Sequence, residues 1–293
     1  QEVIRAARPP FPQSCSQGQG RRAAFLNAGI ASGHGGRPTA RETLMTQLAV
    51  LGATGNLGRR VAALAIERGH SVSAAVRTRH KLDLVIAASA KVSEIDLLQA
   101  SPDTLAHFIE GHDALICCAG QVTDGEAFVT LVDKVVTAAE SLPQEQRPVC
   151  WFLAGAALLT LDARGRRGVD LPKVRDVYWP HDLNFQRLQR STLDWRLLCP
   201  GPMVDQPPLG TERLRIAVDA LACPMPGWVR HLPPPLLLPW FALKVPEMII
   251  SYDDAAVFML SHLEAGDALS RHRVGLALPA GMRGRKDQWT ARK

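Results

Sequence analysis

Three glycines in the run LAVLGATGNLGRRVAAL, residues 48–64, constrain the fold of this chain more than any other feature. They lie between an apolar stretch, which predicts a buried strand, and an amphipathic stretch, which predicts a helix. Gly52 allows a tight turn, Gly55 lets the backbone approach a phosphate, and Gly58 lets the helix lie close to the strand. The pattern predicts a phosphate-binding turn that opens a dinucleotide-binding unit, with a plain tight turn as the alternative.

The chain after Met45 alternates short apolar runs with amphipathic runs of helix length. Continuous apolar strands that alternate with helices predict a parallel sheet covered on both faces, which is a doubly wound α/β domain of the Rossmann type. The predicted strands are 47–53, 71–77, 91–97, 113–120, 149–155 and 193–201, and the predicted helices are 56–68, 101–110, 126–141 and 180–190.

Residues 202–247 break this rhythm because they are rich in proline and contain Trp228 and Trp240. We expect an insertion that closes over a flat apolar substrate as a lid, with a packing or dimerisation arm as the alternative. A strand and a helix return over 248–263, and a late strand follows over 272–281. These boundaries predict one domain over 45–282.

The net charge of +6 lies in the two ends of the chain. Residues 1–44 and residues 283–293 each carry +4, which leaves −2 for residues 45–282. A basic groove for nucleic acid is therefore not expected. Residues 1–44 are expected to be a disordered leader or an upstream extension before Met45, with an Arg-rich targeting segment as the alternative. Residues 283–293 are expected to be a solvated basic tail.

The cysteines and the hydropathy of the chain indicate the cellular environment of the protein. The six cysteines show no metal-ligand spacing, and several lie in apolar runs, so we expect no metal site and a reducing, cytoplasmic location. The most apolar stretch, residues 233–250, is interrupted by prolines and by Lys244. It falls short of the roughly 20 apolar residues that a membrane span needs, so we expect no stable membrane insertion.

The end of the second predicted strand indicates the cofactor. NAD-binding domains place an acid there for the ribose 2′-hydroxyl, whereas arginine suits the 2′-phosphate of NADP. Here the strand ends in AAVRTRH, which places Arg77 and Arg79 at this point. The guanidinium fork matches phosphate geometry. We therefore expect NADP(H) as the cofactor, with a solvated arginine pair as the alternative.

Four segments together resemble a known family: LGATGNLG, the AVR ending, GHDALICCAG and STLDWRLLCPGPMVDQPPLGT. They are similar to the atypical short-chain dehydrogenase/reductases with an NAD(P)H-binding, NmrA-like fold, and within these to the biliverdin-IXβ reductase/flavin reductase branch. The resemblance covers residues 46–210 well and 248–278 loosely. It implies a phosphate turn at Thr54, Asn56 and Leu57, an adenine pocket at Asp96 and Leu97, a ribose side at Ala119 and Gly120, and a nicotinamide side at Ala154, Gly155, Pro200 and Gly201.

The proton relay typical of that superfamily is not visible in the sequence. Typical members use a Tyr-x-x-x-Lys pair with a serine, in which lysine lowers the tyrosine pKa. The two tyrosines are Tyr178, which Asp182 follows four residues later, and Tyr252. His181 matches a His-Asp pair that the resemblance places at the corresponding helix. With an ordinary pKa near ~6.5 it is a candidate proton donor, and a structural hydrogen bond is the alternative.

These features predict a reductase that passes hydride from NADPH to a flat conjugated acceptor such as a flavin or a quinone. Such an acceptor needs chiefly to stack on the nicotinamide, and its proton can come from solvent. The alternative is a non-catalytic NADP(H)-binding redox sensor of the NmrA-like type, acting on a regulatory protein partner. An isomerase or epimerase that uses bound cofactor is a third reading. The sequence leaves open whether the protein forms a homodimer.

Overall fold

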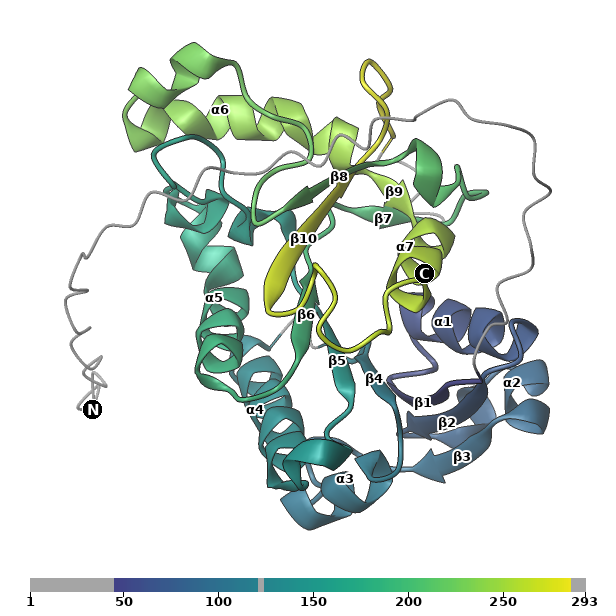
Figure 1. Ribbon diagram of the computed structural model, residues 1–293. Helices are drawn as coiled ribbons and strands as arrows, with labels where there is room; N and C mark the ends of the chain where they lie inside the picture. The colour runs from purple at the N-terminus through teal and green to yellow at the C-terminus, as the bar shows by residue number, and fades with distance from the viewer. Residues whose placement is uncertain (1–44, 121–123, 286–293) are drawn as a thin grey trace, which may run out of the picture.

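A computed structural model describes residues 45–120 and 124–285, so the predictions for residues 1–44 and for 286–293 of the basic tail lie outside the described residues. The centre is an eight-stranded sheet with the order β3-β2-β1-β4-β5-β6-β10-β8 (Figure 1). All neighbouring strands in it pair in parallel except β8, which is antiparallel to β10. The strands are β1 (Gln47–Leu51), β2 (Ser71–Val76), β3 (Lys91–Glu94), β4 (Ala114–Cys117), β5 (Val149–Leu153), β6 (Trp195–Leu198), β8 (Arg215–Val218) and β10 (His272–Ala277).

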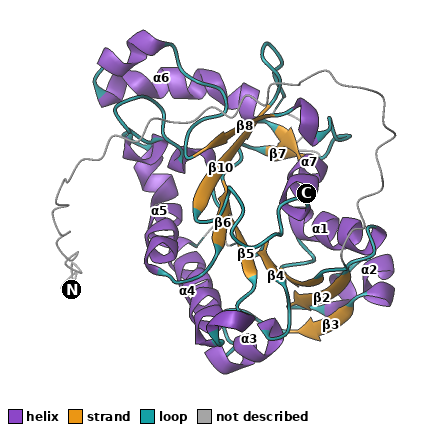
Figure 2. Cartoon of the chain, viewed as in Figure 1, coloured by secondary structure: helices purple, strands orange, loops and turns teal. Residues whose placement is uncertain are grey.

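Helices cover both faces of this sheet (Figure 2). Helices α1 (Asn56–Glu67), α2 (Leu84–Ser89) and α7 (Tyr252–Leu260) pack on one face, and α3 (Pro102–Ile109), α4 (Gly125–Ser141) and α5 (Val174–Arg190) pack on the other. Strand β1 shows why two cores form. Leu48 and Val50 belong to the core under α1, whereas Ala49 and Leu51 belong to the core under α4, because side chains alternate across a strand. The predicted doubly wound α/β fold is confirmed.

Local signals place several helix starts where the sequence predicts them. Ser101 accepts a hydrogen bond from the Thr104 amide at 3.1 Å, and Pro102 occupies the first turn of α3. Asp124 caps α4 and Ser251 caps α7 in the same way. Such caps satisfy amides that have no partner within the helix.

Helix α5 begins earlier than the predicted start at Pro180. It begins at Val174, so Pro180 lies inside the helix. Val174 and Tyr178, one turn apart, both pack against the core and stabilise the turns that precede the proline. Pro180 itself is buried, and a Cβ added at Gly125 would lie 2.6 Å from its ring. The packing of α5 on α4 therefore holds the proline within the helix.

The proline-rich residues 202–247 contribute to the sheet as well as to a surface helix. They contain β7 (Met203–Val204), which pairs with β9 (Ile250–Ser251), then the edge strand β8 and helix α6 (Pro234–Lys244). Prolines occupy the first turn of α6, where a missing amide hydrogen costs no helical bond. The role of this segment as a lid and the domain boundary at residue 282 stay predictions.

Helix α1 packs directly on the turn that precedes it. A Cβ added at Gly58 would lie 2.2 Å from the carbonyl oxygen of Gly52. That distance is below any real contact, and the atom it meets is backbone, so a side chain at this position forces α1 away from the turn. Gly58 is thus required by the close approach of helix and turn.

We predict that Gly58→Ala destabilises the protein by about 1–3 kcal/mol or more, as overpacking does. Helix propensity alone predicts that this substitution stabilises the protein, since alanine favours the helix over glycine by about 1 kcal/mol. The measurement is the urea midpoint of unfolding at an unchanged slope. Gly227→Ala is the control, because a Cβ there meets nothing within 4 Å. A Gly58→Ala protein as stable as the wild type would contradict the packing described.

Candidate functional site

The glycine-rich turn lies where the strand order of the sheet reverses, between β1 and β4. Gly52 has a φ of +78°, and its amide donates a hydrogen bond to the carbonyl of Ala75 at 3.1 Å. A Cβ added at Gly52 would lie 2.8 Å from the amide nitrogen of Ala119, in the segment that follows β4. The turn after β1 and the segment after β4 thus touch at the crevice where doubly wound folds bind nucleotides.

The amino end of α1 is open to an anion. Its N-cap is Gly55, no side chain caps it, and its first turn holds no acid, in contrast to the side-chain caps of α3, α4 and α7. Thr54, Gly55 and Asn56 are exposed, whereas Leu57 is buried beneath them. Uncapped amides and the positive end of the helix dipole favour a phosphate at this point.

The guanidinium of Arg60, which the sequence did not single out, is already paired, and it donates a hydrogen bond to the carbonyl of Asn56 at 2.8 Å. Its side chain forms ion pairs with Asp205 and with Asp253, the latter at 3.1 Å. Its guanidinium also lies 5.1 Å from the ring centroid of Tyr252. Tyr252 is therefore a packing residue beside α1.

The carboxyl end of β2 presents Arg77 to solvent. Arg77 is exposed and forms no ion pair with the other residues that the structure describes. Arg79 is exposed too, and its backbone amide donates to the Glu94 carboxylate at 2.6 Å. Glu94 ends β3 opposite Val76 and was missed by sequence reasoning, because strand register decides which residue lies beside Arg77.

The residues predicted for the adenine and ribose sides lie along the next strands of the same sheet edge. The Asp96 carboxylate accepts the amide of Leu98 at 3.0 Å and so shapes its own loop. Leu97 is buried in the core. Ala119 is half-buried and Gly120 is exposed after β4.

The four residues predicted beside the nicotinamide come together at the ends of β5 and β6. The Ala154 amide donates to the carbonyl of Leu198 at 2.8 Å, and the Ala156 amide donates to that of Pro200 at 2.9 Å. A Cβ at Gly201 would lie 2.7 Å from the Cβ of Met248. The backbone at this position is therefore fixed by packing, as a site for a flat ring requires.

An aromatic side chain covers Gly155. A Cβ added there would lie 2.5 Å from Cε1 of Tyr178, on α5. Burial raises the pKa of Tyr178, so the phenol is protonated at neutral pH. Asp182, four residues on, forms an ion pair with Arg167 at 2.6 Å.

His181 lies beside Tyr178 but is not an ordinary titrating histidine. Its ring centroid is 5.1 Å from that of Phe128 and 5.5 Å from that of Tyr178. Its Nδ1 is buried and lacks a hydrogen-bond partner among the described residues. Burial lowers the pKa of His181 to about 4, so the imidazole is neutral at pH 7. The ordinary pKa assumed from the sequence is thus wrong for this side chain, because its burial was not readable from the sequence.

Asn184, one turn after His181, was also missed. It is 5% exposed, and its Nδ2 lacks a partner in the part of the chain that the structure describes. Two buried polar atoms without partners are unusual, since such groups are normally hydrogen-bonded. The only sequence signal was a polar residue on the apolar stripe of α5.

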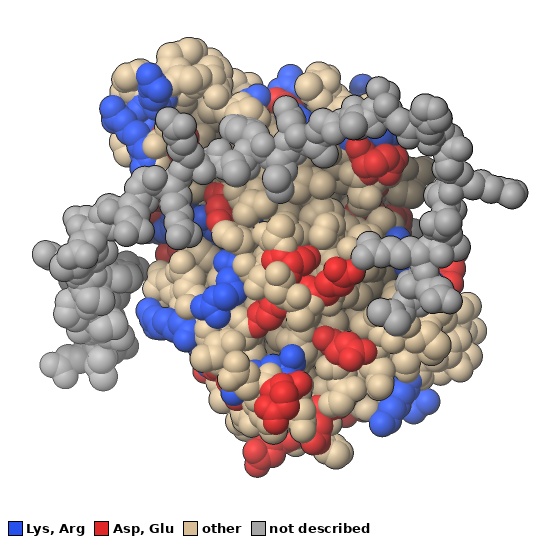
Figure 3. Space-filling model, viewed as in Figure 1, with Lys and Arg blue, Asp and Glu red and all other residues tan. Residues whose placement is uncertain are grey.

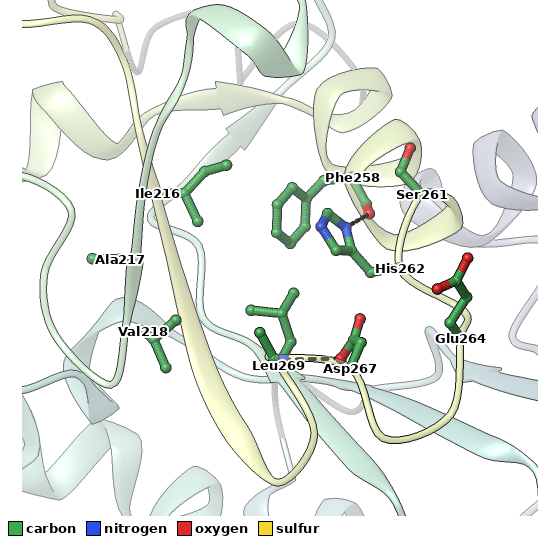
Figure 4. A pocket seen from close by; sticks show the side chains of 10 residues that line it. Ile216, Ala217, Val218, Phe258, Ser261, His262, Glu264, Asp267 and Leu269 are labelled. Carbon is green, nitrogen blue, oxygen red and sulfur yellow. Dashed lines mark hydrogen bonds between the residues drawn. The ribbon is translucent and has the colours of Figure 1, made fainter. Parts of the chain in front are cut away.

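A cavity of about 380 Å³ lies elsewhere, between β8, the end of α7 and the segment before β10 (Figure 4). Ile216, Phe258 and Leu269 form its apolar wall, and His262 and Asp267 add polar groups. None of the predicted site residues lines it. No helix among the described residues combines the length and the apolar character that a membrane crossing requires, and the described residues hold no His/Cys/Asp/Glu group suited to a metal ion.

Comparison with known proteins agrees with this geometry. A family model described as NAD(P)H-binding matches residues 52–220, more than half of the chain. No curated protein matches the sequence.

Three solved structures share the fold. A candidate NADH-flavin reductase from Streptococcus pneumoniae is 21% identical, with a TM-score of 0.59 over 80% of this chain and 99% of its own. An oxidoreductase from Lactococcus lactis is 16% identical, with a TM-score of 0.57 over 83% and 94%. An anaerobilin reductase from Escherichia coli O157:H7 is 16% identical, with a TM-score of 0.54 over 80% and 98%.

The lowered pKa of His181 predicts a pH-dependent stability. In the unfolded chain His181 takes up a proton near pH ~6.5, whereas in the folded protein it does so near pH 4. The contribution of neutral His181 to the free energy of unfolding is therefore complete above pH 6.5, and it is lost as the pH falls toward 4. Between pH 7.5 and pH 5 this loss is about 2 kcal/mol.

Urea unfolding at the two pH values measures this effect. The variant His181→Phe should lose about 2 kcal/mol less than the wild type between them, while the exposed His80→Phe should follow the wild type. An equal loss in His181→Phe and wild type would show that His181 titrates normally.

Proposed function

The chain belongs to the NAD(P)H-binding family, and from that premise we propose that it is an NADPH-dependent reductase of a flat conjugated acceptor such as a flavin or a quinone. Membership of the NAD(P)H-binding family agrees with the resemblance to atypical short-chain dehydrogenase/reductases, and the fold shared with two reductase structures supports it. The narrower NmrA-like assignment stays a prediction. The cofactor, when bound, supplies a hydride from its reduced nicotinamide ring.

The residues present fit a dinucleotide. Gly52 and Gly58 leave no room for a Cβ, and the uncapped start of α1 offers its open amides to the pyrophosphate. Ala154, Gly155, Pro200 and Gly201 would hold the nicotinamide end, and Asp96, Leu97, Ala119 and Gly120 would hold the adenosine end.

Arg77 supports NADP(H) over NAD(H). Its guanidinium is exposed at the end of β2, where the ribose is bound in this fold, and no described acid neutralises it. The carboxylate of Glu94, at the end of the neighbouring strand β3, accepts a hydrogen bond from the backbone amide of Arg79. We assign the 2′-phosphate to Arg77, with Arg79 as a second cation at the rim.

The observation that carries the choice of acceptor is the Tyr178 ring on Gly155. A ring at this point offers a stacking surface to a flat acceptor. It offers no activated proton donor, because burial raises the Tyr178 pKa and its neighbour one turn on is Asp182. The neutral His181 beside it holds no acidic proton at pH 7. An acceptor whose reduced form takes its proton from solvent suits these residues better than a ketone does.

Consumption of NADPH by the full chain tests the proposal. FMN, riboflavin, biliverdin and several quinones are supplied in parallel, and NADPH oxidation is followed by absorbance. Saturable oxidation with at least one of them is the expected result. Tight NADPH binding without oxidation of any acceptor would instead favour a redox sensor that acts through a protein partner.

Two variants of Tyr178 separate a stacking role from a proton-donating role. Tyr178→Phe keeps the ring and should retain turnover within about threefold, whereas Tyr178→Ala should lower kcat/KM roughly tenfold. The measurement is kcat/KM for the acceptor that is reduced. If the phenol is a general acid, Tyr178→Phe loses on the order of 10²- to 10⁴-fold, and the stacking role is wrong.

The variant Arg77→Asp should weaken NADPH binding roughly 10- to 100-fold, because it removes charge-assisted hydrogen bonds to a phosphate. NADH binding should change little. Fluorescence titration of both nucleotides measures the two dissociation constants. Lys91→Asp is the control, since this exposed residue lies at the opposite end of β3. Equal losses for NADPH and NADH would overturn the assignment of the 2′-phosphate.

A further inference from the structure

The outer side of α6 is entirely apolar although it faces solvent. Its exposed residues are Pro234, Pro235, Leu236, Pro239, Ala242 and Leu243. Leu236 is 54% exposed and Leu243 is 53% exposed, values that are high for leucine side chains one to two turns apart on the same helix. A surface helix normally presents polar residues to water. An uninterrupted apolar face of this kind marks a surface that contacts something else.

The inner side of the same helix is already used for packing. Leu237 is fully buried and Phe241 is 8% exposed. A Cβ added at Gly168 would lie 3.2 Å from Cζ of Phe241. The helix is therefore anchored to the body of the protein in its present orientation. Its outer face is available for a second contact without unfolding or reorienting α6.

Tryptophans extend the apolar surface toward the preceding segment. Trp228 is 52% exposed, and its ring meets that of Trp240 edge to face, with the centroids 4.8 Å apart. Tryptophan is enriched at membrane interfaces, because its apolar ring and its polar N–H suit a boundary between lipid and water.

Positive charge predominates around this surface. Residues 220–246 contain Arg230 and Lys244 and no aspartate or glutamate. Arg230 is exposed, and its carbonyl accepts a hydrogen bond from Arg166 at 3.0 Å. Figure 3 shows basic side chains on the lobe that contains α6, at the upper left, amid a largely uncharged surface.

A groove beside α6 combines the same two properties. It has a volume of about 360 Å³ and is lined by Pro226, Trp240 and Leu243 together with Lys244 and Arg283. Glu247 also lines it, but that carboxylate is neutralised by Lys244 at 2.8 Å and by Arg215 at 2.7 Å. Apolar walls under a basic rim suit an acyl chain below an anionic head group.

We propose that α6 and the segment that precedes it dock this protein on the surface of an anionic lipid bilayer. The exposed leucines and Trp228 enter the boundary between head groups and acyl chains. Arg230 and Arg283 face the lipid phosphates, and Lys244 and Arg215 together outweigh the single charge of Glu247 beside them. An 11-residue helix is too short to span a bilayer, so the contact is peripheral and reversible. Basic residues beside an apolar face strengthen such binding, because anionic lipids attract them. This docking does not depend on the proposed reductase activity.

Binding of the full chain to vesicles tests the proposal. Large vesicles of phosphatidylcholine with roughly 30% phosphatidylglycerol are compared with vesicles of phosphatidylcholine alone, by flotation. We expect binding to the anionic vesicles, weakened by salt, and at least tenfold weaker binding to the neutral ones. Failure to bind the anionic vesicles, or equal binding to both, would overturn the proposal.

Paired variants separate the α6 surface from apolar surface in general. Leu236→Glu with Leu243→Glu should lower partitioning at least tenfold, because charge is placed in the lipid-facing helix side. The control is Leu84→Glu with Val85→Glu on α2, whose side chains are 85% and 65% exposed. The control pair should bind vesicles as the wild type does, and both pairs should keep the wild-type thermal midpoint.

A second copy of the chain is the competing occupant of this face. Sedimentation velocity of the wild type and of both variant pairs decides between them. A monomer that binds anionic vesicles supports lipid docking. A dimer that becomes monomeric only in the Leu236→Glu, Leu243→Glu pair, with no vesicle binding in the wild type, would show that the face is a protein interface.

Discussion

The contact between the start of α1 and the turn before it sets the rest of the site. With no side chain at Gly58 or Gly52, the helix axis is brought onto the end of β1, and its amino end points into the crevice between β1 and β4. Because no side chain caps that end, its amides and its dipole stay available to a ligand phosphate. In the proposed site the pyrophosphate is therefore bound by backbone groups, whereas the 2′-phosphate is bound by the side chain of Arg77.

In the proposed function the opposite end of the crevice holds the nicotinamide, and there the structure differs from what a ketone reductase needs. Tyr178 and His181 lie where a proton relay is expected, yet burial makes both of them neutral, poorly acidic groups at pH 7. The same burial makes them a rigid aromatic wall with Phe128. An aromatic surface without a proton donor favours acceptors that bind by stacking. The proposed reduction of a flat acceptor is consistent with both ends of the crevice.

The features that the sequence could predict were local ones. The glycine spacing, the Ser-Pro start at Ser101 and the alternation of apolar runs each act within a few residues. The fold confirms the turn between β1 and α1, the start of α3 and the alternation of strands and helices. Features that depend on tertiary packing could not be read in advance. The start of α5 before Pro180, the pKa of His181 and the position of Glu94 beside Arg79 depend on contacts between distant elements. The apolar outer face of α6 was hidden for another reason, because its prolines resemble those of a loop and only the helix reveals which residues share a side.

The structure of the full chain in complex with NADP⁺ tests the central claim most directly, since it locates each part of the cofactor. We expect the pyrophosphate on the turn from Gly52 to Gly58, the 2′-phosphate within hydrogen-bonding distance of Arg77, and the nicotinamide beside Gly155 and Tyr178. A dinucleotide bound elsewhere, for instance in the cavity lined by Ile216 and His262, would contradict the account. So would a nicotinamide ring that lies away from Tyr178, because the aromatic wall would then have no part in the reaction.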